Sequence, residues 1–115
     1  MEMDLFAGVA VSDLPRAIAW FDQLLGEVET FEPNDSERVW TIAEHRHVYV
    51  ELQPEHAGHA MVTLFVEDVD GFVDAVARRG IQPESQETYE NGVRKAIYRD
   101  PDGNEVGVGG PPQEE

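Results

Sequence analysis

One hydrophobic pattern occurs twice along the chain. Val11-Ser12-Asp13-Leu14 returns 55 positions later, from 11 to 66, as Val66-Glu67-Asp68-Val69. An apolar run precedes each motif, at residues 6–11 and 61–66. After each motif, apolar residues recur at helical spacing. A short apolar run followed by a 3.6-residue period predicts a strand and then a helix in each half of the chain.

The two predicted helices begin at aspartates and end at glycines. Asp13 and Asp68 can accept hydrogen bonds from the first backbone N–H groups, and Pro15 suits a first turn because it has no amide hydrogen to lose there. Gly26 and Gly80 suit the left-handed position that follows a helix. The residues predicted to face inward are Leu14, Ala17, Ile18, Phe21, Leu24 and Leu25 in the first helix, and Val69, Phe72, Val73 and Val76 in the second.

Three strands are predicted after each helix. They span about 27–31, 38–43 and 48–52 in the first half, and about 82–89, 93–99 and 105–108 in the second. Asn91-Gly92 predicts a two-residue hairpin turn because both residues tolerate positive φ, and Asp100-Pro101-Asp102-Gly103 predicts a type I turn. The chain thus predicts an α+β fold built from two βαβββ modules.

The length of 115 residues is typical of one domain. We expect module one at about 4–53, a linker at 54–59, module two at about 60–109 and a tail at 110–115. No apolar run approaches the ~20 residues that span a bilayer, and the N-terminal residues lack the basic region of a signal peptide. The expected location is therefore the cytoplasm. With no cysteine, disulfides, thiolate metal sites and cysteine nucleophiles are excluded.

The chain is strongly acidic, with 24 Asp and Glu against eight Lys and Arg and a formal charge of −16. Such a surface repels phosphate backbones and anionic membranes, so we expect neither as a partner. The acidity could instead attract a cationic ligand or provide general solubility. Because the acids are spread along the chain rather than clustered, solubility is the favoured interpretation.

Alternation along the predicted strands separates two faces of the sheet. One face is aliphatic and suited to packing under helices: Val9, Val11, Val48, Val50, Leu52, Val62, Leu64, Val66, Val106 and Val108. The other face mixes aromatic, small and polar residues: Phe6, Gly8, Ala10, Tyr49, Glu51, Met61, Thr63, Phe65, Glu105 and Gly107. This mixture is typical of a ligand cleft, although a second core or a dimer interface would look the same. Trp40 is assigned to this mixed face.

The motifs resemble the vicinal oxygen chelate superfamily, which contains glyoxalase I, extradiol dioxygenases, fosfomycin-resistance enzymes and bleomycin-resistance proteins. The stretches that carry the resemblance are residues 9–21, Leu24-Leu25-Gly26, residues 66–69, and Tyr98-Arg99-Asp100-Pro101-Asp102-Gly103-Asn104. The resemblance implies two modules whose mixed sheets curl into a cup with helices on the outer face. The cup is usually completed across a homodimer.

In metal-dependent members of this superfamily, ligands come from the first and last strand of each module. The resemblance maps these four positions to Phe6, Glu51, Met61 and Gly107. Only Glu51 can bind a hard cation, and a catalytic metal usually needs about three protein ligands. We therefore expect no metal, with one divalent ion on a displaced Glu51–His59 site as the alternative.

The four histidines are interpreted as solvated loop residues. His45 and His47 fall in a predicted hairpin turn, and His56 and His59 fall in the linker. His47 shares strand parity with Glu51, but four residues correspond to about 13 Å along a strand, too far for both to bind one ion.

The sequence favours a small-molecule binding protein, closest to the metal-free bleomycin-resistance branch, that sequesters an aromatic or cationic ligand in a dimeric cleft. The candidate ligand-binding residues are Phe6, Trp40, Tyr49, Glu51, Met61, Thr63 and Phe65. Glu51 is the one candidate for catalysis, as a general base if burial raises its pKa. Alternatively, it is an acid that contacts a cation or polar ligand, or a leftover acid that is paired with an arginine such as Arg94 or exposed at the rim of the cleft. The alternative function is a divalent-metal-dependent lyase, isomerase or dioxygenase with a rearranged site.

Overall fold

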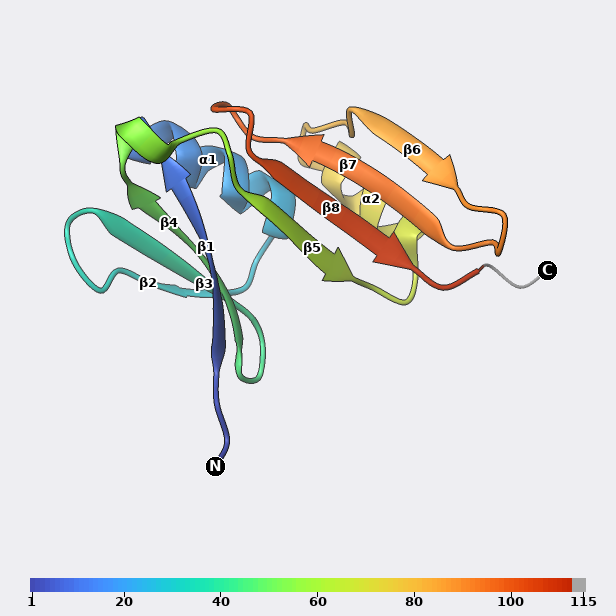
Figure 1. Ribbon diagram of the computed structural model, residues 1–115, viewed down its shortest axis with the longest axis horizontal. Coiled ribbons are helices and arrows are strands. Elements are labelled where there is room, and N and C mark those ends of the chain that lie inside the picture. Colours follow the sequence, from blue (N-terminus) through green and yellow to red (C-terminus); the bar gives the residue numbers. More distant parts are fainter. Residues whose placement is uncertain (113–115) are drawn as a thin grey trace.

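The computed structural model describes residues 1–112 and contains two βαβββ modules in tandem (Figure 1). Module one comprises β1 (Leu5–Val11), α1 (Leu14–Leu25), β2 (Glu29–Phe31), β3 (Glu37–Ala43) and β4 (Arg46–Leu52). Module two comprises β5 (Met61–Phe65), α2 (Val69–Arg78), β6 (Ser85–Thr88), β7 (Arg94–Arg99) and β8 (Glu105–Gly110). A short 3₁₀ helix, η1 (Pro54–His56), lies between them. The predicted α+β class and the repeated module are confirmed.

Each module forms its own four-stranded sheet. The strand order is β1-β4-β3-β2 in the first sheet and β5-β8-β7-β6 in the second. The first and last strands of each module run parallel, and the other neighbours are antiparallel. The helices lie behind the sheets in the view of Figure 1. The face of each sheet away from its helix is called its open face below. The two sheets remain open and separate rather than closing into one barrel.

The helix boundaries confirm the predicted caps. The side chain of Asp13 accepts a hydrogen bond from the Arg16 amide at 3.1 Å, and Asp68 accepts one from the Gly71 amide at 2.9 Å. Both aspartates have the extended backbone usual for this position. Gly26 follows α1 directly with φ of 75°, a conformation that residues with a Cβ rarely adopt. These local signals position each helix against its sheet.

The hairpin at Asn91-Gly92 differs from the prediction. The Tyr89 amide donates to the Val93 carbonyl and the Gly92 amide donates to the Tyr89 carbonyl, which leaves three residues in the loop. Gly92 has positive φ and Asn91 does not, so a turn followed by a left-handed glycine replaces the predicted two-residue turn. The second predicted turn is confirmed, because the Gly103 amide donates to the Asp100 carbonyl at 2.9 Å.

The core lies between each sheet and its helix. Buried aliphatic residues from the predicted helix-facing set line it: Val9, Val11, Val48, Val50, Val106 and Val108. Val62, Leu64 and Val66 around β5 are only half-buried, because β5 is an edge strand beside a groove between the modules. Within residues 1–112, neither helix is long and apolar enough to span a membrane.

Trp40 lies in this core, which corrects its assignment to the mixed face. The β3–β4 register places Trp40 beside Val48, on the helix side of the sheet. Its side chain is 0% exposed, and its ring centroid lies 5.4 Å from that of Phe21. The indole Nε1–H donates to Asp22 Oδ1 at 2.9 Å, which satisfies its one polar group. Trp40 therefore has no free surface for a ligand.

A buried asparagine joins the two modules. The Asn104 side chain is 0% exposed and donates to the Ala10 carbonyl at 2.9 Å. Its oxygen accepts hydrogen bonds from the Gly58 amide at 3.1 Å and the Ala60 amide at 2.9 Å. The turn before Asn104 thus holds the end of β1 and the segment between the modules. Nearby, the Asp102 carboxylate accepts a hydrogen bond from the Ser12 amide at 3.0 Å.

Candidate functional site

The open face of the first sheet carries three rows of neighbouring side chains, set by strand register. The first row is Phe6, His47 and Thr41; the second is Gly8, Tyr49 and Val39; the third is Ala10, Glu51 and Glu37. Because cross-strand neighbours on one face lie about 5 Å apart, each row forms a continuous strip. Phe6, Tyr49 and Glu51 were predicted on this face, and the structure places all three there.

Aromatic rings cluster on the first two rows. The Phe6 ring stacks on the His47 imidazole with centroids 4.1 Å apart and planes 16° apart. The Phe6 and Tyr49 rings meet edge to face at 6.4 Å. The Tyr49 ring lies directly over Gly8, where a Cβ would come within 2.7 Å of it. A glycine at position 8 is therefore what lets the Tyr49 ring approach β1 so closely.

His47 belongs to this cluster, which corrects its interpretation as a solvated loop residue. The strand β4 begins at Arg46 rather than 48, so His47 is a strand residue and its side chain is only 9% exposed. Its Nε2 lies 2.7 Å from a carboxylate oxygen of Asp4, and its Nδ1 lies 3.0 Å from Thr41 Oγ1. Both ring nitrogens therefore have partners, and the imidazole is held rigidly beneath Phe6.

Asp4 connects this cluster to the β3–β4 turn. Its second carboxylate oxygen lies 2.7 Å from Nδ1 of His45, in the turn. Hydrogen bonds from His47, and then from His45, hold the pKa of the Asp4 carboxyl below its usual value. The N-terminal end of β1 is thus tied to the start of β4 by a carboxylate between two imidazoles.

Two carboxylates face each other on the third row. Glu51 of β4 is the cross-strand neighbour of Glu37 of β3, and like charges in this position disfavour each other. Asn34 donates a hydrogen bond to Glu37, whereas Glu51 makes no side-chain hydrogen bond or ion pair with any residue in 1–112. Arg94, the suggested partner of Glu51, binds Asp70 instead at 2.8 Å. That pairing is therefore wrong, and Glu51 remains an uncompensated half-buried acid.

The remaining predicted site residues lie on the other sheet. Met61 and Phe65 on β5 are 76% and 71% exposed, and Thr63 lies between them on the same face. Gly107, the neighbour of Thr63 on β8, lies under Lys95, whose Cε would be 3.0 Å from a Cβ at that position. The aromatic contacts within residues 1–112 do not link Phe65 to Phe6 or Tyr49.

Three of the four positions at which the resemblance places metal ligands do not fit a metal here, and Glu51 is the exception. Phe6 and Met61 offer a hydrocarbon ring and a thioether, and Gly107 offers no side chain. The cationic Lys95 lies across Gly107, which further opposes a metal ion at that position. His56 and His59 are exposed. Within residues 1–112, no group of three or more acids and histidines is arranged to hold an ion.

His47 and Glu37 are site residues that the sequence interpretation missed. For His47 a signal existed, because it shares strand parity with Tyr49 and Glu51. For Glu37 there was no signal, since its place beside Glu51 depends on the β3–β4 register.

The open face of the first sheet offers a ligand the rings of Phe6 and Tyr49 beside the negative charge of Glu51.

Comparison with known proteins identifies the family. The sequence profile of the Glyoxalase/Bleomycin resistance protein/Dioxygenase superfamily matches residues 4–108. A glyoxalase / bleomycin resistance protein from Catenulispora acidiphila is 50% identical in sequence; the match covers 96% of this chain and 100% of that chain, with a TM-score of 0.92. No curated protein matches the sequence.

More distant structures share the fold. The lactoylglutathione lyase of Agrobacterium tumefaciens is 19% identical, with 96% of this chain and 94% of that chain covered and a TM-score of 0.77. TnmS3, an antibiotic binding protein from a Streptomyces species, is 22% identical, with 96% and 97% covered and a TM-score of 0.73. The chain has two βαβββ modules, a profile match over nearly its whole length, and a relative with which it shares half of its residues. It therefore belongs to the Glyoxalase/Bleomycin resistance protein/Dioxygenase superfamily.

Proposed function

We propose that this protein binds a small aromatic or cationic molecule on the open face of its first sheet, without a metal ion. The observation that carries the proposal is the position of uncompensated Glu51 in the row next to the Phe6–His47–Tyr49 cluster. Ring faces attract cations through their quadrupole, and a nearby carboxylate adds direct Coulomb attraction. A flat cation can satisfy both at once.

The Glu37–Glu51 neighbourhood supports a positively charged ligand. Two carboxylates on adjacent strands disfavour each other until a positive charge lies between them or near them. The chain's formal charge of −16 would also concentrate cations at its surface. Both effects weaken with salt, so affinity for a cationic ligand should fall as ionic strength rises.

The family positions and one fold relative support binding rather than metal chemistry. Phe6, Met61 and Gly107 lack the side chains that would hold a metal. TnmS3, which shares this fold, is an antibiotic binding protein. A metal-dependent lyase, isomerase or dioxygenase would need ligands from elsewhere, and no observation on the described residues favours it.

We further propose that a second copy of the chain completes the site. Both open faces carry exposed apolar side chains, Phe6 on the first sheet and Met61 and Phe65 on the second. Apolar surface of this kind is usually covered by a partner. A homodimer that sets the first sheet of one copy against the second sheet of the other would enclose a ligand between them. Sedimentation that shows only monomer at micromolar concentration would contradict the dimer.

Binding of charge-matched aromatic probes tests the proposed function. N-methylquinolinium and its uncharged isostere 1-methylnaphthalene are titrated into the wild type and Glu51→Gln by calorimetry, at low and high salt. We expect Glu51→Gln to weaken N-methylquinolinium binding about three- to five-fold, the size of one partly solvated charge contact, and to leave the isostere unchanged. Glu55→Gln, on exposed η1, is the matched control and should change neither affinity.

Two results would count against the proposal. If N-methylquinolinium bound equally well to the wild type and Glu51→Gln at every salt concentration, the charged contact would be wrong. If neither probe bound, and Tyr49→Ala had no effect in a wider screen of aromatic compounds by thermal shift, the aromatic face would not be a binding site.

A further inference from the structure

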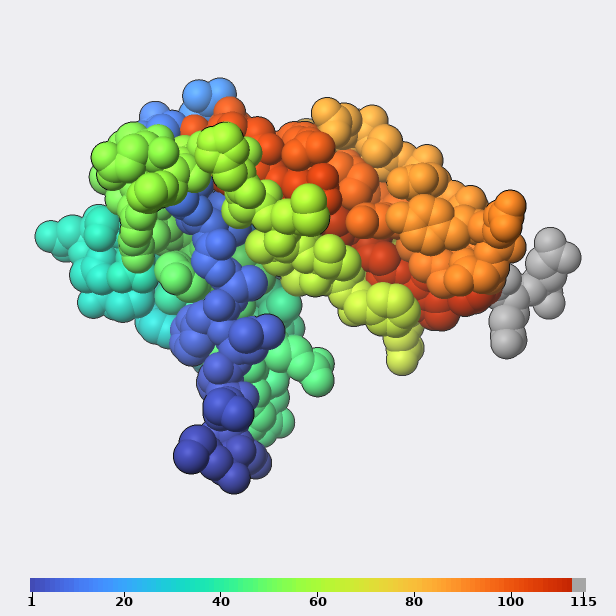
Figure 2. Space-filling view, viewed as in Figure 1, coloured from blue at the N-terminus to red at the C-terminus, as the bar shows by residue number. Residues whose placement is uncertain are grey.

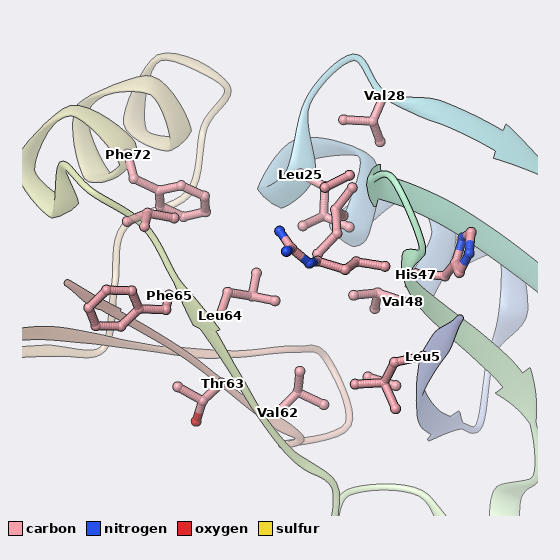
Figure 3. A pocket seen from close by; sticks show the side chains of 15 residues that line it. Leu5, Leu25, Val28, His47, Val48, Val62, Thr63, Leu64, Phe65 and Phe72 are labelled. Atoms are coloured by element: carbon pink, nitrogen blue, oxygen red, sulfur yellow. The ribbon is translucent and has the colours of Figure 1, made fainter. Parts of the chain in front are cut away.

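A groove of about 480 Å³ separates the two modules on the helix side of the sheets. In Figure 2, a notch in the outline of the molecule separates the blue N-terminal strand from the yellow-green β5. In the close view, Val62 and Leu64 of β5 point across the groove toward Leu25 and Val48 of module one (Figure 3). Phe72 of α2 lies at one end of the groove. The volume is in the range of small-molecule sites.

The groove lies on the opposite side of the first sheet from Phe6 and Tyr49, although His47 of the open-face cluster and Thr63 and Phe65 of β5 also line it. Its floor on β1 and β4 is formed by Leu5, Ala7 and Val48, which alternate along the strands with Phe6 and Tyr49 and so lie on the opposite side of the sheet. Among residues 1–112, neither Phe6, Tyr49 nor any acidic residue lines it. The groove's walls are therefore almost wholly aliphatic and aromatic.

Of the residues that the structure describes, one with a free charge lines the groove, Arg46 with its guanidinium. The other basic lining residue, His47, has both ring nitrogens bonded to Asp4 and Thr41. Arg46 makes no ion pair or side-chain hydrogen bond with any residue in 1–112, although the chain has 24 acids for eight basic residues. Arg46 is exposed at the groove, and a guanidinium beside apolar walls can bind a carboxylate through two parallel hydrogen bonds.

We propose that this groove binds a small molecule with an apolar body and a single carboxylate, which Arg46 holds. The apolar walls fit a hydrocarbon chain or ring system of about ten carbons at this volume. One guanidinium matches one negative charge, and the chain's net charge of −16 disfavours ligands that carry more. The proposal rests on Arg46 and the aliphatic lining of the groove, and it does not depend on the proposed function.

Three probes that share a ten-carbon chain, used below their micelle concentrations, test this site: decanoate, decanol and decyltrimethylammonium. Each is titrated into the wild type, Arg46→Gln and Arg16→Gln, with melting curves to establish that all three proteins are folded. Arg16 is an exposed arginine on α1 outside the groove, which makes it the matched control. We expect decanoate to bind the wild type and Arg16→Gln equally, to bind Arg46→Gln at least about tenfold more weakly, and to outcompete decanol.

Each of the following outcomes would contradict the proposed carboxylate site. Equal decanoate binding by the wild type and Arg46→Gln, or decanol binding as tight as decanoate binding, would remove the role of the guanidinium. Binding of none of the probes, with a stable dimer by sedimentation, would make a second copy of the chain the occupant of the groove. Loss of decanoate binding in Glu51→Gln would place it on the open face instead. N-methylquinolinium binding should be unchanged in Arg46→Gln, which separates failure of this site from failure of the proposed function.

Discussion

Replacing Asn104 by alanine should destabilise the whole fold, because this side chain bonds three separate segments. Its amide donates to the Ala10 carbonyl and to Asp100, and its oxygen accepts from the Gly58 and Ala60 amides. Each hydrogen bond contributes about 1 kcal/mol net, and buried groups left without partners add a further penalty. For four such bonds at a fully buried position, we expect a loss of about 3–5 kcal/mol in the free energy of unfolding.

Urea denaturation followed by far-ultraviolet circular dichroism measures this loss directly. At about 4 °C per kcal/mol for a domain of this size, the melting temperature should fall by about 12–20 °C. Asn91→Ala is the matched control, since Asn91 is exposed and its side chain accepts one hydrogen bond, from the Val93 amide. Asn91→Ala should lower the free energy of unfolding by less than about 1 kcal/mol. If Asn104→Ala stayed within about 1 kcal/mol of the wild type, Asn104 would not join the modules.

The remaining predictions concern the core, the aromatic cluster and pH. The Tyr98 hydroxyl is buried without a partner in residues 1–112. Tyr98→Phe should therefore leave the free energy of unfolding unchanged in urea melts, or raise it by up to about 1 kcal/mol. A loss of more than about 1 kcal/mol would show that the hydroxyl makes a hydrogen bond. A Cβ at Gly8 would meet the Tyr49 ring at 2.7 Å, so Gly8→Ala should lower the free energy of unfolding by about 1–3 kcal/mol. The displaced ring should also weaken N-methylquinolinium binding, and an unchanged affinity would exclude Tyr49 as a contact of this ligand. Hydrogen bonds, first from His47, lower the folded-state pKa of Asp4, so its stabilising effect is present above its usual pKa and is lost as pH falls through the lowered value. The stability difference between wild type and Asp4→Asn should therefore shrink between pH 6 and pH 2, and a constant difference would contradict the bonds.

The fold could be predicted because its signals are local and occur twice. Asp13 and Asp68 cap their helices as the pattern indicated, and the strands follow in the predicted order. Such features depend on a few neighbouring residues. Because the same motif occurs in both halves, it predicts the same order of strands and helix twice, and both halves follow that order.

The site was predicted less completely because it depends on register between strands. In β3 the register shifts between Thr41 and Ala43, so alternation cannot be extended through this strand, and Trp40 was placed on the wrong face. The sequence places His47 in a turn because the apolar residues of this strand start at Val48, whereas β4 begins two residues earlier, at Arg46. The groove beside Arg46 forms where the two modules meet, a contact that no local pattern encodes.

Metal content after loading tests most directly whether this protein works without a metal ion. Untagged protein is incubated with Ni²⁺, Zn²⁺, Mn²⁺ or Fe²⁺ in turn, dialysed, and analysed by elemental mass spectrometry beside Glu51→Ala. Because Phe6, Met61 and Gly107 stand at the positions where the resemblance places metal ligands, we predict that no ion is retained in stoichiometric amount and that the two proteins are indistinguishable. Retention of about one ion per chain, lost in Glu51→Ala, would contradict the account and establish a metal centre.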